Sequence, residues 1–142
     1  MVAANVLRGN TDFDGLLRDR ARLRVVIPSR GAVLADRAEV AASSWRRMRG
    51  LLGRPALVAG QGLLIVPCQG VHTLGMGYPI DVVHLDRDGV VRKVLHAVRP
   101  WRLGPLVWRS RCVLELPAGA AAGMVVGDQV ALLPLPDEAT SR

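Results

Sequence analysis

Three side chains with soft or borderline donor atoms stand at equal spacing in the middle of the chain: the thiol of Cys68, the imidazole of His72 and the thioether of Met76. Such donors together favour Cu(I) or Zn(II). A spacing of four puts all three on one side of a helix or a strand. Against a metal, Gly70 and Gly75 interrupt both periodicities, and no second Cys or His stands at a known zinc spacing.

Three interpretations of this segment therefore stay open. Packing of Cys68 and Met76 in the core is the favoured one, and a soft-metal site and a binding pocket without metal are the alternatives. His84 lies within an apolar run. We expect it to be a partly buried, hydrogen-bonded imidazole rather than a metal ligand.

Two acids interrupt apolar runs, Asp81 within PIDVV and Glu115 within VLELP. A carboxylate buried alone costs several kcal/mol, so each needs a partner or a function. We predict that Asp81 forms an ion pair with an arginine of residues 47–54, with Arg54 or Arg47 as the natural partner. Recognition of a ligand by Asp81 is an alternative. General acid–base catalysis is another, and there the two carboxylates would have to approach each other.

Two tryptophans flank arginines near residue 105: Trp101 precedes Arg102, and Trp108 precedes Arg109. Such side chains can stack on bases or sugars. The favoured interpretation is that Trp101 and Trp108 cover an edge of the core, because aromatic residues on an apolar loop usually do so.

The elements that must position these residues are mostly strands. Alternating and β-branched runs bounded by turn residues predict a hairpin of Leu23–Pro28 with Ala32–Ala35, and a hairpin of Tyr78–Asp86 with Val90–Val98 around an Asp-Gly turn. Three further strands are predicted at Gly62–Val66, Cys112–Pro117 and Gln129–Leu133, with a loop at Trp101–Trp108 and one helical turn at Ala118–Met124.

One amphipathic helix is predicted at Ser44–Leu52, capped by Ser43 or Ser44. Its apolar residues recur at helical spacing and should pack on the sheet: Trp45, Met48, Leu51 and Leu52. The opposite face carries arginines. A solvated face is the favoured interpretation of this cluster, over a carboxylate clamp or a phosphate-binding patch.

The composition of the chain limits its domain organisation, its partners and its compartment. A chain of 142 residues that is 50% hydrophobic and 22% charged can bury one core without disulfides. The formal charge of +7 is concentrated in residues 1–54, which hold eleven arginines against five acids. Only weak binding to nucleic acid or an anionic surface follows, without sequence specificity, because no recognition motif is present. No run reaches the roughly 18 apolar residues of a membrane span, and no export signal begins the chain, so we expect a cytoplasmic protein.

Several short motifs in one order resemble the DUF192 family, also called UPF0127, over about residues 40–133. They are Arg47-x-x-Gly50-Leu51-Leu52-x-Arg54, GLLIV, PIDVVHLDRDG, VLELPAG and Val126-Gly127-Asp128. The resemblance implies a compact, mainly β domain with little helix and no assigned biochemical activity.

The sequence therefore predicts an α+β fold, mainly antiparallel β, with one short helix on the sheet. We divide the chain into a loose arm (1–20), one domain (21–135) and a frayed tail (136–142). The predicted function is a small non-enzymatic binding module without cofactor. Its partner is an unknown small ligand or a protein, and its cleft is formed by Arg54, His72, Met76, Tyr78, Asp81, Trp101 and Trp108. A soft-metal protein using Cys68, His72 and Met76 and a weak binder of nucleic acid or anionic surfaces are the alternatives.

Overall fold

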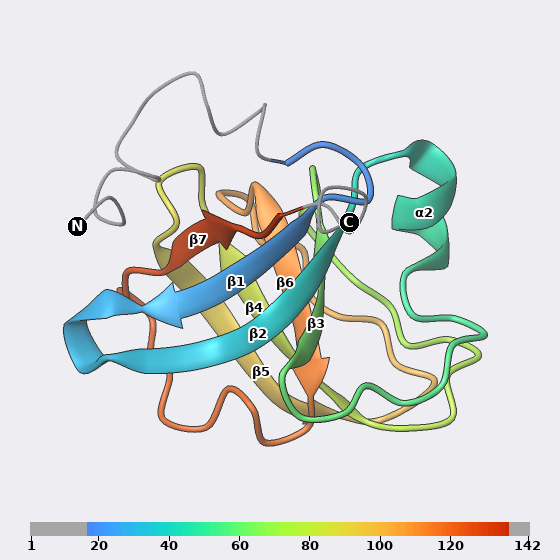
Figure 1. Cartoon of the computed structure of the whole chain (residues 1–142). Coiled ribbons are helices and arrows are strands. Elements are labelled where there is room, and N and C mark those ends of the chain that lie inside the picture. Colours follow the sequence, from blue (N-terminus) through green and yellow to red (C-terminus); the bar gives the residue numbers. More distant parts are fainter. Residues whose placement is uncertain (1–16, 137–142) are drawn as a thin grey trace.

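The computed structural model describes residues 17–136 and shows one curled sheet with a short helix beside it (Figure 1). The strands are β1 (Arg22–Ile27), β2 (Ala32–Ala41), β3 (Gln61–Ile65), β4 (Ile80–Leu85), β5 (Val91–Val98), β6 (Cys112–Pro117) and β7 (Ala131–Pro134). The helices are the 3-10 turn η2 (Pro28–Arg30) and α2 (Ser44–Arg49). The strand order is β5-β4-β6-β3-β2-β1-β7, and all neighbours are antiparallel except β2 and β3. The predicted fold class is confirmed.

Both predicted hairpins form. In the β4–β5 hairpin, Oδ1 of Asp86 accepts hydrogen bonds from the backbone N–H of Asp88 at 2.8 Å and of Val90 at 3.0 Å. These bonds explain why the Asp-Gly sequence turns there. β2 continues six residues beyond its predicted end at Ala35, although Asp36, Arg37 and Glu39 break the apolar run. Backbone hydrogen bonds to β1 on one side and to β3 on the other keep these residues extended, although their own strand propensity is low.

Each face of the sheet packs its own set of side chains. The larger cluster lies inside the curl, where β1 and β2 cross in front of β4 and β6 (Figure 1); it includes Leu23, Val25, Leu85, Leu114 and Leu132. The curl nearly closes, because Val90 and Gln129 form an isolated bridge next to β5 and β7. The smaller cluster lies on the outer face of the sheet and includes Leu63, Ile65, Ile80, Val82 and Val113.

α2 forms part of the crossover between the parallel strands β2 and β3. Its N-terminus is capped by Ser43, whose Oγ accepts from the N–H of Arg46 at 3.3 Å. The helix ends at Arg49, before the predicted Leu52. The prediction that its apolar stripe packs on the sheet is wrong for Trp45 and Met48, which are exposed; only Leu51, beyond the helix, is buried.

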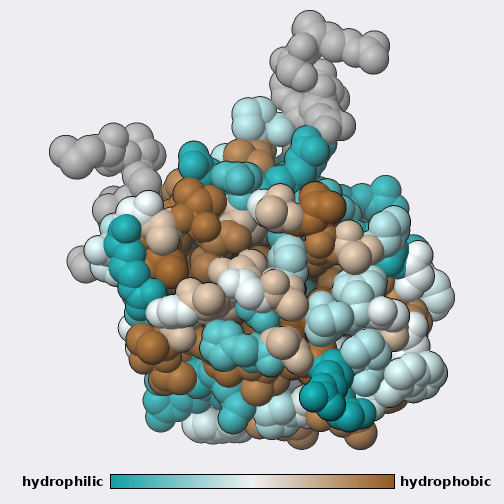
Figure 2. All heavy atoms as spheres, turned by 90° about the horizontal axis from the view of Figure 1, so that it is seen from below, coloured by the Kyte–Doolittle hydropathy of each residue, from teal (hydrophilic) through white to brown (hydrophobic). Residues whose placement is uncertain are grey.

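Apolar residues are also exposed elsewhere. On the side seen in Figure 2, hydrophobic side chains lie among hydrophilic ones at the surface. No helix within residues 17–136 is long and apolar enough to cross a membrane. Residues 1–16 of the predicted arm and 137–142 of the predicted tail lie outside the described residues. Leu17, at the end of that arm, is buried in the larger cluster.

Candidate functional site

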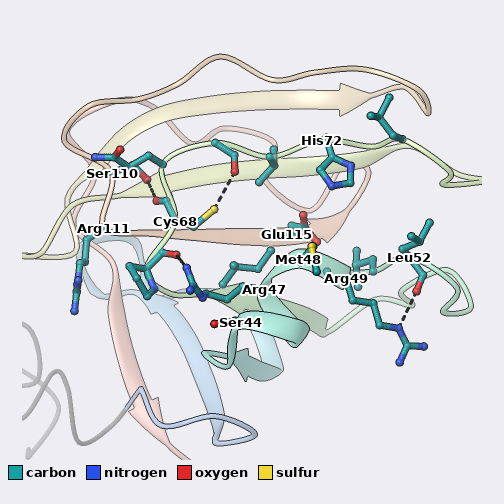
Figure 3. Close-up of a pocket in the computed structure, with 18 of the residues that line it drawn as sticks. Ser44, Arg47, Met48, Arg49, Leu52, Cys68, His72, Ser110, Arg111 and Glu115 are labelled. Carbon is teal, nitrogen blue, oxygen red and sulfur yellow. Dashed lines mark hydrogen bonds between the residues drawn. The ribbon is translucent and has the colours of Figure 1, made fainter.

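A cavity of about 800 Å³, hereafter the α2 pocket, opens between α2 and the chain that follows β3 (Figure 3). Residues 47–52 form one wall and residues 67–72 the other. In Figure 3, Arg47 and Met48 stand on the helix side, and Cys68 and His72 on the opposite side. The floor is the outer face of the sheet, at Ile65 and Glu115, and arginines 87, 109 and 111 also line the pocket.

Glu115 is the buried polar group of this floor. Alternation along β6 turns Val113 and Glu115 to the outer face, so the carboxyl group points toward α2. The residue is 3% exposed, and its Oε2 has no hydrogen-bond partner among the described residues. Burial raises the pKa of Glu115 to about 8, against the opposing effect of the Arg54 charge. The neutral acid is therefore its main form at pH 7, and it can donate a hydrogen bond as well as accept one.

Gly50 brings the backbone over this carboxyl group. Its φ of 51° and ψ of −126° are strained for any residue with a side chain. A Cβ atom at this position would lie 3.7 Å from Oε2 of Glu115. The glycine thus both ends α2 and covers the acid.

Arg47 adds a second unsatisfied group to the same pocket. Its Nη1 donates to the carbonyl oxygen of Pro67 at 3.2 Å, which ties the two walls together. Its Nε is buried and has no partner within the described part of the chain. Buried polar atoms without partners are rare and call for an explanation. Here a donor and a carboxyl oxygen are both left unsatisfied in one cavity.

The three soft donors reach the α2 pocket together, as their spacing allowed. Cys68, His72 and Met76 all line it, and Met76 also packs in the outer cluster, as core packing predicts. The thiol of Cys68 donates to the carbonyl oxygen of Gly70 at 3.0 Å, and burial raises its pKa. It is therefore a neutral thiol at pH 7. Within residues 17–136, no group of three or more His, Cys, Asp or Glu side chains is placed to hold a metal ion.

His84 is a hydrogen-bonded imidazole, as predicted, but it is fully rather than partly buried. Its Nδ1 lies 3.0 Å from Oγ of Ser110, and that hydroxyl donates to the carbonyl oxygen of Cys68 at 2.8 Å. The serine must therefore accept from Nδ1–H, which leaves Nε2 without a proton. Burial lowers the pKa of His84 to about 4 and keeps the ring neutral.

The predicted ion pair of Asp81 is wrong. Alternation along β4 turns Asp81 to the inner face of the sheet, away from α2 and from Glu115. Its carboxylate accepts three backbone hydrogen bonds: from Ala97 at 2.8 Å, Gly119 at 3.0 Å and Ala121 at 2.9 Å. Arg46 and Arg54 pair instead with Glu39. Asp81 joins β4 to β5 and to the loop after β6, and it is not part of the pocket.

The other predicted cleft residues lie outside the α2 pocket. The hydroxyl of Tyr78 donates to the backbone carbonyls of Arg54 and Pro55 at 3.5 and 3.4 Å. Trp101 and Trp108 are exposed, so the prediction that they cover a core edge is wrong. Of the predicted cleft residues, His72 and Met76 line the α2 pocket, and Tyr78 contacts Arg54 outside it. The sequence predicted only that Glu115 needs a partner or a function, and its place as an acid within an apolar strand was the signal for its position in the pocket floor.

Fold and site together define a small β domain with a ligand-sized pocket on the outer face of a curled sheet. The chain belongs to the DUF192 family, described as "Uncharacterized ACR", whose profile matches residues 25–132. The family resemblance is thus confirmed. No curated protein sequence matches the chain.

Two solved structures share this fold. A protein of unknown function from Novosphingobium aromaticivorans DSM 12444 is 25% identical, with a TM-score of 0.66, and the match covers 77% of this chain and 82% of that one. A protein from Sinorhizobium meliloti 1021, named as a proposed transcription regulator, is 24% identical, with a TM-score of 0.64, and the match covers 78% of this chain and 91% of that one. The second likeness shows the fold alone.

Proposed function

We propose that the protein is a small non-enzymatic binding module that holds an organic ligand in the α2 pocket. The observation that carries this proposal is the pair of unsatisfied buried atoms, Oε2 of Glu115 and Nε of Arg47, in one cavity. A ligand group with both a donor and an acceptor, such as a carboxamide, has the hydrogen-bonding groups that these two atoms lack, and it would reach them once the side chains that cover them shift.

The size and lining of the pocket support the same function. A volume of about 800 Å³ lies within the roughly 300–1,000 Å³ range of small-molecule sites. Apolar side chains from both walls, among them Leu51, Val71 and Met76, would contact the body of the ligand. The arginines at 87, 109 and 111 favour a ligand that also carries a negative charge.

The chemistry of the pocket supports binding rather than catalysis. The one thiol that lines it donates to a backbone carbonyl and is protonated at neutral pH, so it is not activated as a nucleophile. The imidazole of His84 is not among the lining residues and is hydrogen-bonded to Ser110, not to the thiol.

Cys68 also offers a direct assay, because the second cysteine, Cys112, is fully buried. A library of small amides and carboxylic acids is screened by thermal shift, and each hit is tested for protection of Cys68 against a thiol-alkylating reagent. We expect hits to slow alkylation, and we expect protein alkylated at Cys68 to lose them. Cys68→Ser treated with the same reagent is the matched control and should keep binding. Hits that bind equally well after alkylation would contradict the proposal.

A soft-metal site is the second candidate, favoured by the convergence of Cys68, His72 and Met76 on one pocket. It would require the thiol to leave Gly70 and lose its proton. Titration with Cu(I) separates the two functions, because only a metal site would take up the ion stoichiometrically.

A further inference from the structure

The loop between β5 and β6 carries the three most exposed large apolar side chains of the described residues, and a fourth that is nearly as exposed. We call residues 99–109 the Trp ridge. Its four large apolar residues are exposed by 65%, 77%, 84% and 82%: Trp101, Leu103, Leu106 and Trp108. Values this high mean that the side chains project from the surface rather than line a groove. A cluster of this kind is unusual on a protein that stays free in water.

The backbone of the Trp ridge is held firmly against the neighbouring segment, residues 69–73. Four backbone hydrogen bonds of 2.8–2.9 Å join them: the N–H groups of Val107, Gly104 and Trp101 donate to the carbonyl oxygens of Gln69, Val71 and Thr73, and the N–H of Thr73 donates to the carbonyl oxygen of Arg102. The side chain of Thr73 adds a bond to the carbonyl oxygen of Arg99 at 2.6 Å. Gly104 permits this close approach, since a Cβ there would lie 3.0 Å from the oxygen of Val71.

This anchoring separates the Trp ridge from a loose loop. Its apolar side chains are displayed by a backbone that is already ordered, so little conformational entropy is lost when they bind. The four side chains are therefore positioned for contact with something outside the chain.

The charges of the Trp ridge indicate what that contact is. Arg99, Arg102 and Arg109 are interleaved with the apolar residues, and residues 99–111 contain no Asp or Glu. The guanidinium of Arg109 lies 5.8 Å from the ring centre of Trp108, so a cation sits directly beside an exposed aromatic ring. Tryptophan and leucine beside arginine suit the boundary between lipid headgroups and acyl chains, where aromatic rings settle and basic groups meet anionic phosphates.

We propose that the Trp ridge docks the protein on an anionic phospholipid surface. Trp101, Leu103, Leu106 and Trp108 enter the headgroup region, and the three arginines bind lipid phosphates. The ridge shares Arg109 with the lining of the α2 pocket, but its four apolar residues lie outside that lining, as do Arg99 and Arg102, so this inference does not rest on the proposed function.

Vesicle cosedimentation with the full chain tests the proposal. Vesicles of phosphatidylcholine with about 30% phosphatidylglycerol are compared with pure phosphatidylcholine, at low and at physiological salt. We expect binding to the anionic vesicles that weakens but persists as salt rises. The double variant Trp101→Ser/Trp108→Ser should lower the partition coefficient at least about tenfold, because two large apolar groups no longer leave water.

The matched control is Val125→Ser/Val126→Ser. It also removes two exposed apolar residues, next to Met124, which packs in the inner cluster on the other face of the sheet. Its partition coefficient should stay within about twofold of the parent. Thermal melting of both variants checks that each is folded, as expected for exposed positions. Glu115→Gln should bind vesicles like the parent, which keeps this test separate from the pocket.

Three results would overturn the proposal. The first is a parent protein that does not bind anionic vesicles at low salt. The second is a tryptophan variant that binds as well as the parent, which would leave only arginine-driven adhesion. The third is an equal loss in both double variants, which would show nonspecific hydrophobic sticking. Binding of a protein through the ridge, without vesicle binding, would assign the surface to that partner instead.

Discussion

Replacing Asp81 should destabilise the fold strongly, although no arginine pairs with it as first predicted. The carboxylate is fully buried and accepts three backbone hydrogen bonds. The bond from Ala121 is buried, and the bonds from Ala97 and Gly119 are partly buried. In Asp81→Ala, the N–H of Ala121 loses its acceptor and cannot reach water. The N–H groups of Ala97 and Gly119 are only partly buried, so water can replace the lost acceptor there in part.

The magnitude follows from these environments. A charge-assisted bond at a buried donor contributes about 1.5–3 kcal/mol, and each partly buried one contributes about 1 kcal/mol. The sum predicts that Asp81→Ala loses about 3.5–5 kcal/mol of unfolding free energy, a large share of the roughly 5–15 kcal/mol of a typical domain. Asp81→Asn keeps the shape but turns an NH2 group toward one of the donors, so it should lose about 1–3 kcal/mol.

Urea denaturation followed by circular dichroism measures both losses through the midpoint at constant slope. Asp36→Ala is the matched control, because Asp36 is an exposed acid on β2 of the same sheet, and it should change stability by no more than about 0.5 kcal/mol. An Asp81→Ala midpoint equal to that of Asp36→Ala would refute the reasoning. So would an Asn variant as damaging as the Ala variant.

Three further predictions follow from the pocket and the charge distribution. Burial raises the pKa of Glu115 in the folded protein to about 8, so the folded protein binds one more proton than the unfolded chain between about pH 4.5 and 8. The free energy of unfolding should therefore fall as pH rises through that window. Glu115→Gln should flatten this fall in urea titrations at pH 5, 7 and 9, and a pH dependence equal to that of the parent would contradict it. We expect no stoichiometric uptake of Cu(I), because the thiol of Cys68 is protonated and already bonded; tight uptake of about one equivalent that is lost in His72→Ala would establish the metal site instead. Binding to DNA should be micromolar or weaker at physiological salt and independent of sequence, and a mobility-shift titration that finds salt-resistant, nanomolar preference for one sequence would overturn this.

Local patterns predicted the elements of this fold well. The hairpin around Asp88-Gly89 and the strand Cys112–Pro117 depend on turn chemistry and on alternation, which neighbouring residues supply. The amphipathic helix was predicted in the right place, but the exposure of Trp45 was not. A helical wheel identifies an apolar stripe, and only the position of the helix relative to the sheet decides whether the stripe is covered.

The candidate site was predicted less completely, for a related reason. The segment from Cys68 to Met76 was singled out by its donor types, and it lines the pocket. Arg47 and Gly50, which face this segment across the cavity, come from a different element more than fifteen residues away. No local sequence pattern predicts that they lie close to it. Asp81 and Glu115 occupy similar apolar runs in the sequence. In the structure, however, Asp81 accepts three backbone hydrogen bonds, whereas Oε2 of Glu115 has no hydrogen-bond partner among the described residues.

The sequence was sufficient for what short-range physics controls: most strand and turn positions, the helix and the family. Tertiary structure alone decided which face of the sheet each acid occupies, that β2 pairs in parallel with β3, and that the tryptophans remain in water. Alternation states only that neighbouring side chains point to opposite faces. Which face is inside, and which atoms come to lie beside Glu115, depends on how distant segments close over the sheet, and that is a property of the whole chain.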